Sequence, residues 1–156
     1  MALALTGELA VIDARLHQHA TSIEQVLRLQ TIPAIGEKVA LTIYAWVGDI
    51  SRFHTARQLC AYAGLTPSVR QSADSSVTGR ITKEGSKQLR RALTQAGHVL
   101  LFRCQSESSA PLKAKPARIA VHRARRKIAV VAAARHILRT AFSVPFARLQ
   151  SSTCYV

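Results

Sequence analysis

Apolar residues along most of the chain recur every three or four positions, the spacing of one face of an α-helix. Near the N-terminus this pattern covers residues 3–29 and steps alternately by four and three, as in a heptad seam with one polar member. Its positions are Leu5, Leu9, Ile12, Leu16, His19, Ile23 and Val26. Such a seam fits either a coiled coil between chains or an amphipathic helix packed on its own domain.

The stretch IPAIG interrupts the pattern before a second helical segment over residues 37–47. We therefore expect a helical hairpin with a Pro/Gly turn. Such a turn, with Gly36 beside a helix N-terminus, can direct backbone N–H groups at a phosphate, although an ordinary helix connection has the same pattern. A shorter helix should follow, because Thr55 and Gln58 have capping-box spacing and Gly64 stands where a C-terminal glycine is favoured.

The helical pattern stops over residues 65–82. Pro67, the serine and aspartate cluster at 72–76, and Gly79 are typical of turns. Val69 and Ile81 are placed to join a short extended pair. We expect a loop or a small β-hairpin here, within an otherwise all-α (mostly helical) fold.

Helical spacing returns over residues 84–104 and 117–142, separated by a polar segment, 105–116, that we expect to be a weakly ordered linker. The inner face expected for the last helix is apolar and comprises Val121, Ile128, Val131, Ala134, Leu138 and Phe142. The whole pattern predicts three parts, namely a coiled-coil-like helix at 1–30, a domain at 31–142 and a flexible tail at 143–156.

Charge is distributed unevenly along the chain, whose net charge is +14 at pH 7. Residues 1–69 carry five basic and five acidic side chains, whereas residues 70–156 carry 17 basic and three acidic ones. No acid follows Glu107. This excess favours a polyanionic partner, and we expect nucleic acid, against the alternative of a solvated basic face.

Other classes of protein fit less well. Cys60, Cys104 and Cys154 lie far apart, which argues against a disulfide framework or a zinc site and is typical of a reduced, cytoplasmic setting. The histidines are scattered, so we expect no metal site in this chain. No segment is long and apolar enough to cross a membrane, and we expect no membrane partner.

The segment LTPSVRQSADSS places Ser72 two residues after Arg70, and more basic residues follow within the next turn or two. These are Arg80, Lys83, Lys87, Arg90 and Arg91. A serine hydroxyl is a weak nucleophile unless its proton is removed or its target is polarised. Guanidinium groups can polarise a phosphodiester, so the segment suits phosphoryl transfer. On spacing alone, a turn that binds phosphate or nothing remains the alternative.

A series of short motifs runs in order along residues 27–142. The motifs are I-P-x-I-G, G-D-I-S-R-F, A-R-Q-L-x-A-Y-A-G-L-T-P, R-Q-S, G-R-I-T-K-x-G and L-R-R-A-L, followed by RRKIAVVAAARHILRTAF. Together they resemble the C-terminal transposase domain of bacterial insertion sequences of the 110/116/902 class.

The resemblance implies a DNA recombinase whose serine forms a covalent link to DNA, guided by a structured RNA. The motif's serine falls on Ser72, and Ser75 and Ser76 are poorer candidates for the nucleophile. The helix at residues 5–26 looks like the end of a coiled coil that supports homo-oligomers. With the charge pattern, the resemblance gives a set expected to bind DNA or RNA: Arg70, Arg80, Lys83, Lys87, Arg90, Arg91, Arg123, Arg126 and Gly36.

Some positions depart from the family's pattern. Ala34 and Ala73 stand where it has glycines, and Ser86 replaces a usual asparagine. The family's acidic, metal-binding domain is not matched, so Mg²⁺ is expected only with that N-terminal domain, and the chain alone is expected to be an incomplete enzyme. A non-catalytic nucleic-acid-binding module and a decayed transposase remnant stay open as alternatives.

Overall fold

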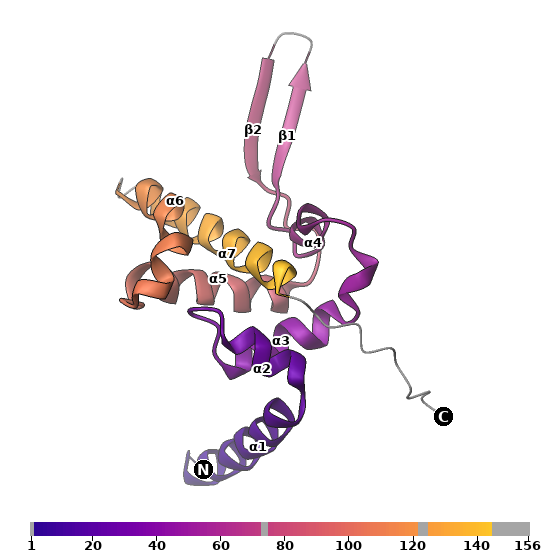
Figure 1. Ribbon diagram of the computed structural model, residues 1–156, viewed down its shortest axis with the longest axis vertical. Coiled ribbons are helices and arrows are strands. Elements are labelled where there is room, and N and C mark those ends of the chain that lie inside the picture. Colours follow the sequence, from indigo (N-terminus) through magenta and orange to yellow (C-terminus); the bar gives the residue numbers. More distant parts are fainter. Residues whose placement is uncertain (1, 73–74, 122–124, 145–156) are drawn as a thin grey trace.

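The computed structural model describes residues 2–72, 75–121 and 125–144. Its elements are α1 (Ala2–Ser22), α2 (Glu24–Gln30), α3 (Glu37–Val47), η1 (Ile50–Arg52), α4 (Ala56–Tyr62), β1 (Pro67–Ser72), β2 (Ser75–Ile81), α5 (Lys87–Phe102), η2 (Glu107–Ser109), α6 (Ala110–Ala120) and α7 (Arg126–Ser143). A helical body lies in the middle, and α1 and the two-stranded hairpin extend from it at opposite ends (Figure 1). The expected mostly helical fold is confirmed.

The core lies where α7 packs on α5, with α4 and α6 against α7 and α3 against α5 (Figure 1). Its fully buried side chains are mainly leucine and isoleucine, including Leu29, Ile43, Leu59, Leu65, Leu89, Leu93, Leu100, Ile137 and Leu138. Small residues form much of the buried face of α7, namely Ala129, Ala133, Ala134 and Ala141. Because these side chains are short, α5 and α7 approach each other closely.

The N-terminal seam is divided between two helices, so the single helix expected at 3–29 is wrong in its extent. Ile23 has an extended backbone between α1 and α2, and the preceding hydroxyl of Ser22 donates to the carbonyl of His19 (2.9 Å). Such bonds compete with helix continuation. Val26 is buried in the domain, whereas Leu9 and Ile12 of α1 are exposed.

Two polar side-chain contacts connect α1 to the start of α3. His17 Nδ1 lies 2.8 Å from a carboxylate oxygen of Glu37, and Lys38 Nζ lies 2.8 Å from one of Asp13. These exposed pairs contribute little to stability, typically 0–1 kcal/mol each. Ala20, near the end of α1, is buried in the core, whereas Leu9, Val11 and Ile12 are more than half exposed.

The Pro/Gly turn between α2 and α3 confirms the predicted helical hairpin. Ile32 and Ile35 are buried on either side of it, and the N–H of Ile35 donates to the carbonyl of Ile32 (3.1 Å). Ala34, between them, has a φ of +70°. That conformation is unfavourable for a residue with a Cβ, and glycine adopts it freely.

Ala34→Gly is therefore expected to raise the free energy of unfolding by about 1 kcal/mol, with a rise in Tm of about 2–4 °C. Gly48→Ala is the matched control, because Gly48 has a φ of +58° with open space around it. It should lower stability by a similar amount in chemical denaturation. Equal stability of Ala34→Gly and the unaltered chain would contradict this account of the turn.

The second half of the chain differs from the prediction in two places. The expected linker at 105–116 instead contains η2 and most of α6, whose Leu112 and Pro116 are buried. The helix expected at 117–142 is two helices, because α6 ends at Ala120 and α7 begins at Arg126. As a result, Val121 and Ile128, assigned to the inner face, are exposed.

Several local predictions are confirmed. Thr55 caps α4 by accepting from the N–H of Gln58 (3.3 Å), and Gly64 has the left-handed φ of +66°. The helix expected at 84–104 is α5. In the described part of the chain, no helix is both long and apolar enough to span a bilayer.

Candidate nucleic-acid interface

The hairpin of β1 and β2 carries the motif around Ser72. The strands are antiparallel, and their register ends with Ser72 opposite Ser75, at the end farthest from the helices (Figure 1). At the base, the N–H of Thr82 donates to the carbonyl of Thr66 (2.9 Å) and Ser68 Oγ to that of Arg80 (3.0 Å). The backbone thus places Ser72 well away from the core, while the side chains of residues 70–78 lie outside the described part.

Arg90 holds the segment between the hairpin and α5. Its Nη1 donates to the carbonyls of Lys83 (3.1 Å) and Ala63 (3.4 Å). A Cβ on Gly64 would lie 2.8 Å from the same Nη1, so glycine leaves room for the guanidinium. Arg90 was expected to bind DNA or RNA, and the structure gives it internal contacts that position Lys83, whose side chain is exposed.

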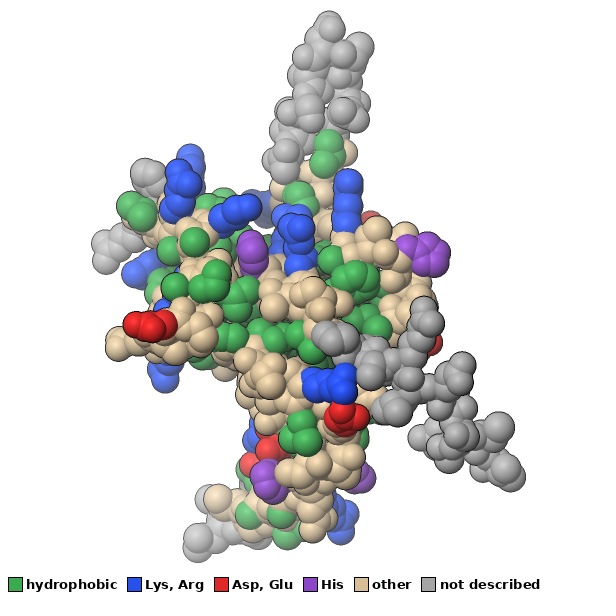
Figure 2. Space-filling view, viewed as in Figure 1, with side chains coloured by type: hydrophobic (Ala, Val, Ile, Leu, Met, Phe, Trp, Pro, Cys, Tyr) green, Lys and Arg blue, Asp and Glu red, His purple; other side chains and the backbone are tan. Residues whose placement is uncertain are grey.

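A basic pocket of 780 Å³ lies between α5 and α7. The two helices bring together two of the arginines predicted to bind nucleic acid, Arg91 and Arg126, with Lys127 beside them. Figure 2 shows lysine and arginine side chains gathered over these helices and near the base of the hairpin, whereas acidic side chains lie mostly elsewhere on this face. Among the described residues, no carboxylate pairs with any of the three.

Aromatic rings line the same pocket. The His98 and Phe102 rings lie 4.8 Å apart, centre to centre, one turn apart on α5. The guanidinium carbon of Arg126 lies 5.4 Å from the centre of the Phe102 ring, and Phe102 is 42% exposed. An accessible ring beside cationic groups can stack on a base while the cations contact phosphates.

Sequence reasoning missed Phe102. It left His98 and Lys127 out of the expected site, although Lys127 belongs to the basic first half of the last expected helix, for which phosphate binding was considered. The spacing of His98 and Phe102 by four residues already places them on one helix face. The contact of Phe102 with Arg126 depends on the packing of α7 on α5, which no local sequence pattern predicts.

The other predicted residues are spread more widely. Lys87 begins α5 and Arg80 lies near the end of β2, both exposed. Arg70 is in β1, and Arg123 lies outside the described residues.

Gly36 caps the N-terminus of α3, on the side of the molecule that carries α1. It lines a hollow with Gln95, a residue that also lines the basic pocket. Glu37 directly follows it in the first turn of α3. The turn thus adjoins the basic pocket through Gln95 but places a carboxylate next to the expected phosphate position.

No metal centre is evident in the described residues, where no three histidine, cysteine, aspartate or glutamate side chains gather at one point. Four of the described acids have other roles: Asp13, Glu24 and Glu37 pair with basic side chains, and Asp49 caps a short helix. Asp49 accepts from the N–H (2.8 Å) and Oγ (2.6 Å) of Ser51, which holds the pKa of its carboxyl below the usual value.

Residues 26–113 match the family model described as "Transposase IS116/IS110/IS902 family". The chain is 42% identical over 78 residues to the transposase for insertion sequence element IS1111A of Coxiella burnetii, covering 50% of the chain and 21% of that protein. It is 32% identical over 149 residues to an uncharacterized 43.6 kDa protein of insertion element IS110 from Streptomyces coelicolor, covering 94% of the chain and 33% of that protein.

A pilin gene-inverting protein of Moraxella lacunata is 39% identical over 75 residues, covering 47% of the chain and 23% of that protein. The chain thus spans about a fifth to a third of the length of these relatives.

Proposed function

The chain belongs to the IS116/IS110/IS902 family of transposases, and we propose that it binds nucleic acid through α5, α7 and the hairpin and presents Ser72 for DNA cleavage and joining. The observation that carries the binding role is the pocket of Arg91, Arg126 and Lys127 around an accessible aromatic ring. Phosphate contacts from such groups supply most of the affinity for nucleic acid.

The pocket suits an unpaired nucleotide better than a base-paired duplex. A base can stack on Phe102 while its flanking phosphates meet Arg91 and Lys127, and Gln95 offers an amide to the base edge. The partner is insertion-sequence DNA, and a structured guide RNA, with its unpaired loops, would be bound by the same chemistry.

The hairpin suits the role of presenting a nucleophile. Ser72 ends β1 at the far end of the hairpin, so a DNA strand can reach it without entering the helical body. Attack by its Oγ on a phosphodiester would form a serine–phosphate ester as the bond to one sugar oxygen breaks, and that oxygen would leave with a proton. Arginines of the same motif, such as Arg70 two residues earlier in β1, would hold the charge of the transition state.

The described residues do not offer the convergent carboxylates of a two-metal site. We therefore derive no step through Mg²⁺ in this chain. Self-association through α1 is a further part of the proposal, because Leu9 and Ile12 of the predicted seam are exposed in the single chain, at 59% and 52%.

A salt titration tests the binding role. Purified chain is titrated with labelled, single-stranded insertion-sequence end DNA and with the RNA, at several NaCl concentrations. Arg126→Gln should lower the slope of log K against log salt by about one, and Phe102→Ala should weaken single-strand binding by about tenfold, as expected for loss of stacking of about 1–3 kcal/mol.

Val121→Ala is the control for Phe102→Ala, because Val121 is 80% exposed and outside the pocket. If the affinity for nucleic acid changes neither with salt concentration nor with these substitutions, the proposed binding role is wrong. A non-catalytic binding module and a decayed remnant remain the alternatives. The first predicts normal binding with no contribution from Ser72, and the second predicts weak binding throughout.

A further inference from the structure

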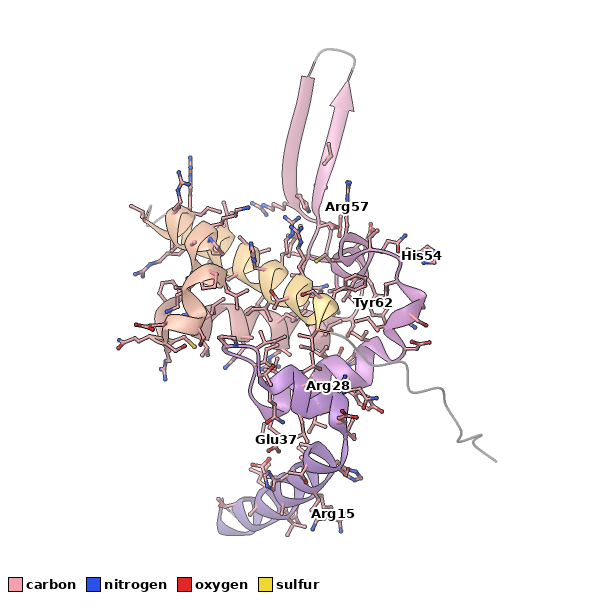
Figure 3. The ribbon with its side chains drawn as sticks, viewed as in Figure 1. Arg15, Arg28, Glu37, His54, Arg57 and Tyr62 are labelled. Atoms are coloured by element: carbon pink, nitrogen blue, oxygen red, sulfur yellow. The ribbon has the colours of Figure 1, made fainter. Side chains whose placement is uncertain are left out.

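A second basic pocket, separate from the one between α5 and α7, lies under the base of the hairpin. Arg57 of α4 lines it together with Arg135 and Arg139, which are one turn apart on α7. Its volume is 430 Å³. The remaining lining residues are Thr55, Ala56, Cys60, Thr66, Pro67 and Val69. Figure 3 shows Arg57 beside the lower end of the hairpin, so the pocket adjoins the strand that leads to Ser72.

The cations of this pocket lack partners within the described part of the chain. The Nε of Arg135 is buried and donates to no acceptor there. No described carboxylate forms an ion pair with Arg57, Arg135 or Arg139. A buried donor without an acceptor destabilises a folded chain, so a water or an anion oxygen from outside the described structure would stabilise this arrangement.

The guanidinium groups of Arg135 and Arg139 both act electrostatically on Cys60, which lines the pocket. Its Sγ approaches the carbonyl of Arg135 (3.9 Å). Burial raises the pKa of the Cys60 thiol, and the guanidinium groups of Arg135 and Arg139 act in the opposite direction. Both groups thus favour negative charge at this place, and an anion in the pocket would be favoured by the same two charges.

We propose that Arg57, Arg135 and Arg139 bind a phosphodiester group of the nucleic acid on which Ser72 acts. The inference rests on the proposed function and adds a second contact to it. Guanidinium groups match phosphate oxygens in geometry as well as charge, and convergence from two helices suits a single phosphate.

The position of this phosphate relative to the serine follows from the hairpin. Five residue steps separate Pro67 from Ser72, which is roughly 16 Å at about 3.3 Å per step. That length corresponds to about five base-pair steps of a duplex, each about 3.4 Å. Binding at the base of the hairpin would therefore set which phosphodiester lies at Ser72.

Three single variants of the full chain test the proposal, each titrated with labelled end DNA over a salt series. Arg57→Gln and Arg139→Gln alter exposed side chains and leave the core intact. Each should weaken binding by about five- to tenfold at fixed salt and lower the salt slope by about one. Arg15→Gln removes the same charge from α1, at the opposite end of the molecule (Figure 3), and should change neither quantity.

The outcomes separate this inference from the function on which it rests. If the unaltered chain binds and Arg57→Gln and Arg139→Gln behave like Arg15→Gln, the arginine pocket is not a phosphate site, although the function stands. If the unaltered chain binds no nucleic acid, both ideas fail. Weaker binding by Arg57→Gln and Arg139→Gln, with binding by Arg15→Gln unchanged, supports the inference.

Discussion

Gly97→Ala is expected to lower the free energy of unfolding by about 2–3 kcal/mol, the cost of overpacking a tight core. Gly97 lies on α5 where that helix crosses α7. A Cβ added there would lie 2.6 Å from the carbonyl oxygen of Val130 and 3.0 Å from the backbone nitrogen of Ala134. Because both atoms belong to the backbone of α7, the helices themselves must separate, and chemical denaturation should measure the loss directly.

Gly7→Ala is the matched control for this prediction. Gly7 also lies within a helix, α1, but nothing lies within 4 Å of a Cβ added there. Alanine should therefore stabilise the chain by up to about 1 kcal/mol through helix propensity alone, provided that α1 unfolds with the rest. If Gly97→Ala and Gly7→Ala shift stability in the same direction, the claim that Gly97 allows α5 and α7 to approach closely is wrong.

Features that depend on a few neighbouring residues could be predicted from the sequence. The Thr55 cap, the left-handed Gly64 and the hairpin at 65–82 each follow from short-range turn and capping chemistry. The mostly helical class of the fold could also be predicted, because helical periodicity dominates the rest of the chain.

Features that depend on packing between elements far apart in the sequence could not be predicted. The apolar stripe of α7 follows alanines that pack against Gly97, so Ile128 was wrongly placed inside. Val121 was also wrongly placed, because α6 ends at Ala120 and α7 begins only at Arg126. Nothing in the sequence distinguishes Arg90 from its basic neighbours, because its hydrogen bonds to the carbonyls of Lys83 and Ala63 form only in the folded chain. Charge alone does not say which arginines serve the fold.

Ser72→Ala is expected to abolish covalent attachment of the chain to DNA, a loss larger than any effect on binding. The substitution removes one hydroxyl at the end of β1 and leaves the strand pairing possible. Binding should stay within about twofold, since affinity comes mainly from basic and aromatic side chains elsewhere. Ser75→Ala is the matched control, because Ser75 is the residue directly opposite in the hairpin.

The most direct measurement is capture of a protein–DNA adduct on a denaturing gel. Labelled insertion-sequence end DNA and its guide RNA are mixed with the chain and with an acidic domain from a related transposase. We expect an adduct from the unaltered chain and from Ser75→Ala, and none from Ser72→Ala. An adduct that persists in Ser72→Ala would contradict the role of this serine, and salt-sensitive binding with no adduct from any of the three would leave a binding domain without a nucleophile.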